Sequence, residues 1–274
     1  MLRLISCASQ LRQELNARNL EYAKWGKLRH VFSYGQNAVV VYEPNNESHG
    51  NFLDVSYRAI LRNPAWTRRL GKVHTGVSHH LPRADYRWRE LDSCMSSDAL
   101  LMNVFCHPRS VKSACSMLGV QSAESPLFGF RARIPLANGR SDRTEVDMKL
   151  GSLLVESKLT EPDFQTKAAE AVEGYRDFRE VFDRRMLPKS GNKYASYQLI
   201  RNVLAAHALG LSFCVLLDAR RPDLIEAWYA VMRCVRRSEL RTRCQVLTWQ
   251  ELSESLPPQL QRFLRNKYGI AAAR

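Results

Sequence analysis

Alternation of apolar and polar residues is clearest between residues 128 and 159. From Phe128 to Ile134, apolar residues occupy every second position, a period of two that is typical of a strand. Asn138-Gly139 then marks a turn, and we expect a second strand to begin near Arg143. Further along, Gly151-Ser152 suits a two-residue hairpin turn of type II′, because glycine stands first. The segment therefore predicts strands joined by tight turns.

Apolar residues recur at helical spacing in most of the remaining chain. We expect helices over residues 52–61, 96–107, 165–186, 194–209, 224–235 and 260–267. Glycines at positions 210 and 269 are suited to end two of these helices. Short apolar runs over residues 37–42, 212–217 and 244–249 predict strands. The first third of the chain is the least regular.

The order of these elements predicts the fold class. Strands that alternate with helices after the hairpin indicate an α/β fold, in which helices flank a central mixed β-sheet. The chain has 274 residues, which allows one large domain or two small ones. Because no change in composition suggests a linker after about Leu91, we expect residues 89–274 to form one domain. Residues 1–88 would then be a basic N-terminal elaboration that contacts nucleic acid.

Composition excludes several classes of protein. Hydrophobic residues make up 45% of the chain and charged residues 25%, which predicts a folded core rather than general disorder. No run approaches the roughly 18–20 consecutive apolar residues of a membrane-spanning helix. The N-terminus also lacks the apolar run of about 7–15 residues found in a secretory signal. We therefore expect a cytoplasmic protein with no membrane partner.

A positive net charge points to a polyanionic partner. Lys and Arg together number 41 against 27 Asp and Glu, which gives a net charge of +14 and a pI near 9.7. Such a field attracts nucleic acid. Two arginine-rich segments, residues 58–89 and 233–243, suit contacts with phosphates, and the first also contains aromatic residues. The candidate contacts are Arg68, Arg69, Arg87, Arg236 and Arg237. The alternative is that these arginines only solvate an ordinary surface.

Cysteine and histidine residues do not indicate a structural metal site. The seven cysteines form no CxxC pair, which argues against both a disulfide framework and a zinc ribbon. Cys106 and Cys214 lie in apolar runs and are expected to be buried thiols. His74, His79 and His80 have no second ligand pair at zinc-finger spacing, so we expect a polar loop there.

The hairpin at Gly151-Ser152 brings four charged residues together. The turn predicts these opposed pairs: Leu150 with Leu153, Lys149 with Leu154, Met148 with Val155, Asp147 with Glu156, and Glu145 with Lys158. Side chains alternate between the two faces of a strand. One face is therefore apolar, and the other holds a compact polar cluster of Glu145, Asp147, Glu156 and Lys158.

The opposed carboxylates in this cluster require a positively charged group between them. Facing Cβ atoms lie roughly 4.5–5.5 Å apart, and like charges at that distance are destabilising. A hard divalent cation such as Mg²⁺ binds carboxylate oxygens together with water and phosphate oxygens. The Lys158 ammonium would then lie beside the metal and a bound phosphate. The alternative is an exposed strand face with an ordinary ion pair between Glu145 and Lys158.

The same residues resemble the active-site signature of the PD-(D/E)XK nuclease superfamily, which has a restriction-endonuclease-like fold. Asp147 is followed across the hairpin by Glu156-Ser157-Lys158, although Glu145-Val146 rather than proline precedes it. The flanking residues resemble a set of predicted bacterial nucleases of that superfamily. The likeness runs from about Glu90 to Ile270 and rests on these motifs: Ser96-Ser97-Asp98-Ala99 with Asn103, Lys158-Leu159-Thr160-Glu161, Tyr197-Gln198-Leu199-Ile200-Arg201-Asn202, Leu247-Thr248-Trp249 and Lys267-Tyr268-Gly269-Ile270.

This resemblance implies a role for each residue of the signature. Asp147, Glu156 and the backbone carbonyl of Ser157 would bind Mg²⁺, for which Mn²⁺ can substitute. Lys158 would position the attacking water and stabilise charge on the phosphate. Some members of the superfamily have a further acidic residue at the metal site. This chain has several candidates for that residue, and the sequence does not decide between them. The accessory candidates are Glu145, Glu124, Glu90, Gln198 and Asn202; the last two are neighbours on one helix face, which could equally be plain polar packing.

We therefore expect a Mg²⁺-dependent nuclease that hydrolyses phosphodiester bonds in DNA, of a restriction or defence type. RNA as substrate stays open, as does the choice between a monomer and a homodimer. A rival hypothesis is a non-catalytic nucleic-acid-binding protein that keeps the nuclease fold. An enzyme acting on small phosphorylated molecules is disfavoured by the basic charge and by the lack of a glycine-rich phosphate loop.

Overall fold

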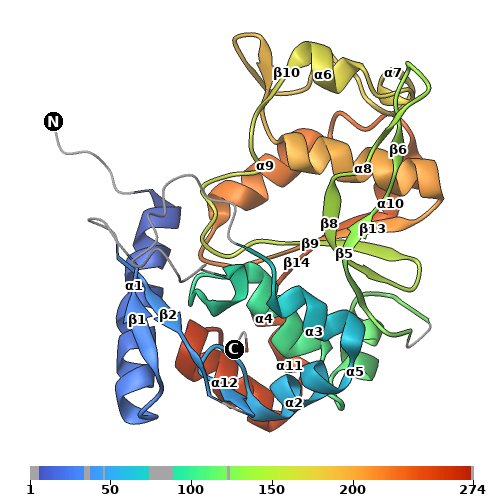
Figure 1. The fold of residues 1–274 in the computed structure, drawn as a ribbon. Helices are drawn as coiled ribbons and strands as arrows, with labels where there is room; N and C mark the ends of the chain where they lie inside the picture. Colours follow the sequence, from blue (N-terminus) through green and yellow to red (C-terminus); the bar gives the residue numbers. More distant parts are fainter. Residues whose placement is uncertain (1–5, 34–37, 46, 74–88, 122–123, 273–274) are drawn as a thin grey trace, which may run out of the picture. The chain divides into compact units, whose positions relative to one another are not determined.

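The computed structural model describes the whole chain except residues 1–5, 34–37, 46, 74–88, 122–123 and 273–274 (Figure 1). The described residues belong to two compact units. One is Met1–Gln121 with Trp249–Arg274, which we call the helical unit, and the other is Ser122–Thr248, which we call the sheet unit. The domain boundary expected at residues 88/89 stays a prediction. No helix in the described ranges combines the length and the apolar character needed to span a membrane.

A five-stranded mixed sheet forms the centre of the sheet unit and confirms the predicted fold class. Its strands, in spatial order, are β14 (Cys244–Thr248), β13 (Ser212–Leu217), β9 (Leu153–Ser157), β8 (Glu145–Leu150) and β5 (Leu127–Arg131). The first three are parallel, and β8 and β5 add to them in antiparallel fashion. β9 is therefore a central strand, and all five of its residues are buried, its polar ones included.

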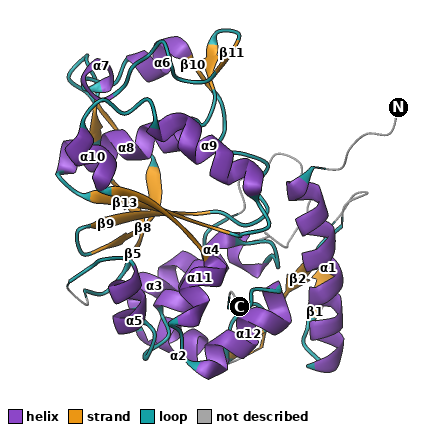
Figure 2. Ribbon diagram, turned by 180° about the vertical axis from the view of Figure 1, so that it is seen from behind, coloured by secondary structure: helices purple, strands orange, loops and turns teal. Residues whose placement is uncertain are grey.

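Helices cover this sheet. α8 (Tyr197–Leu209), α9 (Pro222–Met232) and the short α10 (Ser238–Thr242) belong to the same unit, and α8 and α9 run along one side of the sheet (Figure 2). Buried side chains of the sheet and the helices form one apolar core, in which the rings of Phe213 and Trp228 lie 5.8 Å apart. Removal of this apolar surface from water stabilises the arrangement of strands and helices around the polar cluster.

The predicted hairpin is present, and the three predicted pairs next to the turn are confirmed. Leu150 pairs with Leu153, and Met148 pairs with Val155. Gly151 has a φ of +54°, the left-handed conformation that the first turn residue requires. Asn138-Gly139 forms the other expected turn, between the two-residue strands β6 (Ile134–Pro135) and β7 (Ser141–Asp142). Local turn chemistry thus fixes which side chains of β8 and β9 face one another.

The long helix expected over residues 165–186 is wrong. That segment contains β10 (Lys167–Ala168), α6 (Ala169–Glu173) and α7 (Phe178–Val181), and β11 (Lys189–Ser190) and β12 (Lys193–Tyr194) follow. Residues 174–176 leave the helical path because their backbone pairs with the β6–β7 hairpin: Gly174 accepts a hydrogen bond from Ala137, and Arg176 donates one to Pro135. Val172, Tyr175, Phe178 and Phe182 of the apolar stripe that suggested a helix are buried in the core all the same, whereas Ala168 and Ala171 are exposed.

The helical unit contains a long helix that the sequence analysis missed. α1 (Cys7–Trp25) packs against α12 (Pro258–Tyr268), as the blue and red helices of Figure 1 show. Its buried face is Ala8, Leu11, Leu15, Asn19 and Ala23. Because a buried asparagine interrupts a short apolar stripe, helical periodicity is weak here. The Asn19 side chain is satisfied by the carbonyl oxygens of Leu15 and Lys267.

The helices and the strand that were expected in this unit are present, whereas most of its other elements were not expected. α2 (Asp54–Arg62) and α4 (Ser97–Phe105) lie where helices were predicted, and the Ser96 side chain caps α4. The predicted strand over residues 37–42 is β2 (Val40–Tyr42). The remaining elements are β1 (His30–Phe32), β3 (Pro44–Asn45), β4 (Ser48–His49), α3 (Pro64–Leu70), η1 (Glu90–Asp92), α5 (Val111–Met117) and α11 (Trp249–Glu254). Cys106 and Cys214 are buried free thiols, as expected, whereas His74, His79 and His80 lie outside the described residues.

A fully buried lysine lies where α12 meets α1 and β2. The Nζ atom of Lys267 is 4.0 Å from the ring centroid of Tyr42 and 5.4 Å from those of Tyr22 and Tyr268. It also donates a hydrogen bond to Oδ1 of Asn19. Aromatic faces attract a cation, but they replace only part of its hydration. Burial therefore lowers the pKa of Lys267 from 10.5 to about 7.

This pKa shift predicts a pH-dependent stability. Between about pH 7 and pH 10.5 the unfolded chain holds a proton on Lys267 that the folded chain has released, so stability rises with pH by up to about 1.4 kcal/mol per pH unit. Lys267→Met removes this titration and keeps the others. Denaturant unfolding from pH 6 to pH 10 should show the wild type gaining stability relative to Lys267→Met above pH 7. Parallel pH curves for the two proteins would contradict a buried, neutral lysine.

Candidate active site

The polar cluster of the hairpin is built around one buried ion pair. Nζ of Lys158 lies 2.9 Å from Oε1 of Glu156. The exposed fraction is 1% for Glu156 and 4% for Lys158. Charges taken out of water at this depth are tolerated only when further hydrogen bonds satisfy them. The neighbouring helix α8 supplies such bonds.

Two side chains of α8 support the Glu156 carboxylate. Nδ2 of Asn202 donates a hydrogen bond of 2.8 Å to Oε2 of Glu156, and the Arg201 guanidinium lies 4.0 Å from the same oxygen. Arg201 in turn donates to Oδ1 of Asn202 and, at 2.9 Å, to the backbone carbonyl of Glu145. Both residues are buried. α8 thus holds strands β8 and β9 together at the point where the cluster lies.

Asp147 joins the cluster from the adjacent strand. Its Oδ2 atom accepts a hydrogen bond of 2.8 Å from the backbone N–H of Ser157, one residue beyond Glu156. Unlike Glu156, Asp147 is only half-buried, so solvent reaches the cluster on this side. The structure therefore brings Asp147, Glu156, Ser157 and Lys158 together, as the hairpin register predicts.

The charges in this cluster reinforce one another. Burial alone would raise the pKa of Glu156, but the positive charges of Lys158 and Arg201 outweigh it and hold the pKa below its usual value. Burial alone would lower the pKa of Lys158, but the carboxylates of Glu156, Glu161 and Asp147 raise it above its usual value. Lys158 is therefore an ammonium group and Glu156 a carboxylate at neutral pH. A permanently protonated lysine can stabilise negative charge but does not remove protons.

A buried arginine fixes the segment that follows Lys158. The Arg221 guanidinium donates to the carbonyl oxygens of Leu159, Glu161 and Pro162 at 2.7–3.2 Å, and it also pairs with Asp223. Its exposed fraction is 0%. Asp218, which follows β13 directly, is held by the guanidinium of Arg220 at 2.6 Å. The role of Arg221 could not be predicted, because its main partners are backbone carbonyls.

The segment fixed by Arg221 packs over the ion pair. The ring centroid of Phe164 lies 5.7 Å from Nζ of Lys158, and Phe164 is buried. The backbone carbonyl of Phe164 also accepts the N–H of Gln198 in the first turn of α8. Lys158 is thus enclosed between a carboxylate and an aromatic ring, which restricts its ammonium to one position.

The donor set of the cluster fits a hard divalent cation. Asp147 and Glu156 offer carboxylate oxygens from neighbouring strands, and such oxygens are the protein ligands that Mg²⁺ prefers. Gln198 precedes Asn202 by one turn on the same face of α8. Its Oε1 atom is buried and has no hydrogen-bond partner among the described residues. A buried amide oxygen of this kind normally has a partner, so its position next to the cluster favours a bound group such as water or a cation.

The predicted accessory acids lie in different surroundings. Glu145 is half-buried on β8, and its carboxylate lies 3.6 Å from the Arg131 guanidinium. Glu124 is exposed and precedes β5 at the end that pairs with Lys149, near the hairpin turn. Glu90 belongs to the helical unit, where Lys72 lies 2.9 Å away. The choice among these acids as a further ligand stays open.

The candidate nucleic-acid contacts differ in their exposure and in their ion pairs. Arg68 is exposed in α3, whereas the Arg69 guanidinium donates to the buried carboxylate of Asp98 at 2.8 Å. In the sheet unit, Arg236 is exposed, and Arg237 is exposed and pairs with Glu180 at 3.1 Å. The last candidate is Arg87, which lies outside the described residues.

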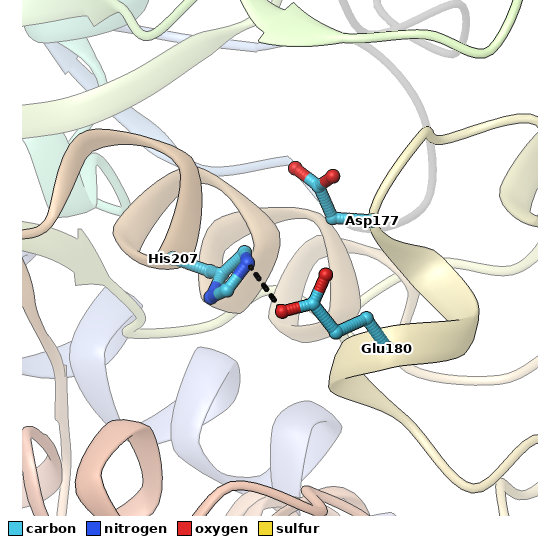
Figure 3. Close-up of side chains that lie close together, drawn as sticks. All are labelled: Asp177, Glu180 and His207. Atoms are coloured by element: carbon cyan, nitrogen blue, oxygen red, sulfur yellow. Dashed lines mark ion pairs between the residues drawn. The ribbon is translucent and has the colours of Figure 1, made fainter.

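A second group of potential metal ligands lies elsewhere in the sheet unit. Asp177, Glu180 and His207 have ligand atoms within 4.8 Å of one another (Figure 3). The carboxylates already have cationic partners, because Arg176 binds Asp177 at 2.8 Å and Arg237 binds Glu180 at 3.1 Å. These contacts account for the group as a network of ion pairs, and we assign it no metal.

The comparison with protein-family models identifies the family of this chain. The model of the family REase-ARP, described as restriction endonuclease associating with ARP, matches residues 17–269. The chain belongs to the REase-ARP family. The match covers the hairpin, α8 and the segments on both sides, so the whole cluster lies within it. Membership supports a restriction-endonuclease-like protein. No curated protein and no solved structure matches the chain.

Proposed function

We propose that this REase-ARP protein is a metal-dependent nuclease of the PD-(D/E)XK type that hydrolyses phosphodiester bonds in DNA, as a restriction or defence endonuclease. The observation that carries the proposal is the buried pair of Glu156 and Lys158, with Asp147 on the next strand. A buried lysine that remains charged beside two carboxylates is costly for stability, and a role in binding an anion at a metal site accounts for it. Membership in a restriction-endonuclease family supports the same conclusion.

Each residue then has a definite task. Asp147 and Glu156, with the backbone carbonyl of Ser157, would hold Mg²⁺ or Mn²⁺. The metal supplies charge neutralisation of the phosphodiester and lowers the pKa of bound water. Lys158 orients the scissile phosphate and stabilises the charge that develops on its oxygens. Asn202 and Arg201 keep the Glu156 carboxylate in position, and the loop held by Arg221 keeps Lys158 in place.

The net charge of +14 favours DNA as the partner, and exposed arginines such as Arg68 and Arg236 are candidate contacts to its backbone. We extend to this chain the association with ARP that the family description names. The proposed catalytic function does not depend on that association, so it can be tested with the isolated protein.

Incubation of the purified protein with supercoiled plasmid tests the proposal. We expect nicked or linear products with Mg²⁺ or Mn²⁺ and intact plasmid with a chelator, because the carboxylates alone supply no activated water. A gel separates the three forms of the plasmid. A protein that shifts the plasmid on the gel and cleaves neither DNA nor RNA with either metal would be a binding module that keeps the nuclease fold.

A further inference from the structure

Four arginine side chains line one cavity in the sheet unit. The cavity has a volume of about 580 Å³, and Arg179, Arg184, Arg185 and Arg236 surround it together with Phe182 and Asp183. None of these six residues belongs to the cluster around Glu156. All four arginines are exposed, whereas Phe182 is buried and forms part of the cavity wall. A cavity of this size accommodates a group as large as a nucleotide.

Backbone hydrogen bonds fix the two segments that supply these arginines. Phe182 and Val235 form a β-bridge although they lie far apart in the sequence. The Asp183 N–H donates to the carbonyl of Cys234 at 2.9 Å, and the Arg236 N–H donates to the carbonyl of Val181 at 2.9 Å. The arginines of both segments are therefore held around the same cavity by the fold itself.

The charges of the cavity are not balanced within the protein. Arg184 pairs with Glu173 at 3.2 Å, outside the lining residues. The Asp183 carboxylate accepts the backbone N–H of Arg185 at 3.0 Å. Among the described residues, no carboxylate pairs with the guanidinium groups of Arg179, Arg185 or Arg236. With Arg184 paired to Glu173, three guanidinium groups against the one carboxylate of Asp183 still leave the lining positive, and such a concave surface concentrates anions.

We propose that this arginine cavity binds phosphate groups of a nucleic-acid strand, as an anchoring site made of other residues than the catalytic cluster. The assignment of the ligand as a nucleic-acid strand rests on the proposed function. Guanidinium groups match the geometry of phosphate oxygens and form paired, charge-assisted hydrogen bonds with them. Phosphate contacts position a strand without selecting its sequence. The cavity therefore sets where a strand lies on the sheet unit.

A matched pair of double variants of the full chain tests this site. Arg185→Gln/Arg236→Gln removes two charges from the cavity, and Arg133→Gln/Arg140→Gln removes two exposed charges of the same unit that do not line it. Both variants change the net charge equally and alter no buried side chain. Binding of a fluorescent 20-base-pair duplex is measured in chelator at several salt concentrations. Direct binding of inorganic pyrophosphate to both variants is measured in parallel by calorimetry.

We expect the cavity variant to bind the duplex at least about tenfold more weakly than the control variant and to lose about 1–2 units of salt slope. Equal affinity and slope for the two variants would overturn the proposal. Arginine-dependent binding of pyrophosphate without binding of the duplex would overturn the assignment to a strand and leave a site for free phosphate. Because chelator prevents hydrolysis, a protein that never cleaves DNA can still pass this test, and a cleaving protein can fail it.

Discussion

Lys158→Met should lower the rate of plasmid cleavage by at least about 100-fold, because it removes the charge that stabilises the phosphate in the transition state. It should also lower the free energy of unfolding by roughly 3–5 kcal/mol, since the Glu156 carboxylate stays buried without its cation. Methionine is close to lysine in length, so lost packing contributes little to either effect. Nicking rates and denaturant unfolding measure the two consequences separately.

The double variant Lys158→Met/Glu156→Gln separates catalysis from stability. Glutamine at position 156 carries no charge and can still accept the hydrogen bond from Asn202. The double variant should therefore recover about 1–3 kcal/mol of stability relative to Lys158→Met while remaining inactive. An unchanged unfolding curve for Lys158→Met would show that the ion pair is not buried in solution. Full cleavage activity would remove Lys158 from the chemistry.

Local rules in the sequence were sufficient to predict the catalytic hairpin. A two-residue turn beginning with glycine permits one register, and the period of two then decides which side chains share a face. The structure has this register, and it brings Asp147, Glu156 and Lys158 together. The strands of the sheet could be predicted equally well, because their apolar runs are short and bounded by turn residues.

Interactions between distant segments explain why other parts of the fold could not be predicted from the sequence. The apolar stripe over residues 165–186 has helical spacing, but backbone pairing of residues 174–176 with the β6–β7 hairpin breaks the helix. α1 was missed because Asn19 lies on its buried face, where it contacts Lys267 near the other end of the chain. A polar residue in an apolar stripe gives no local signal of a helix.

Supporting residues of the site were harder to predict than the signature itself. Arg221 binds three backbone carbonyls of the loop after Lys158, and every residue type offers such carbonyls. Arg201 binds the carbonyl of Glu145 and the amide of Asn202. Its position next to Asn202 in the quoted motif was the one available signal. Side-chain chemistry can be recognised in a sequence, whereas partners on the backbone require the fold.

Asp147→Asn should abolish metal-dependent cleavage at any concentration of Mg²⁺ while the protein remains folded. Asparagine has the shape of aspartate, and its carbonyl oxygen can still accept the N–H of Ser157. The variant loses a charged metal ligand, so we expect the cleavage rate to fall by at least about 100-fold. DNA binding should persist or tighten, because a negative charge leaves a site that binds an anion. Glu170→Gln is the matched control, since Glu170 is an exposed carboxylate of α6.

The nicking rate of supercoiled plasmid in Mg²⁺, compared between Asp147→Asn and Glu170→Gln, tests the central claim most directly. The proposed function predicts wild-type nicking by Glu170→Gln, none above background by Asp147→Asn, and plasmid binding by both proteins. Nicking by Asp147→Asn at the wild-type rate would contradict it and place the chemistry outside the hairpin.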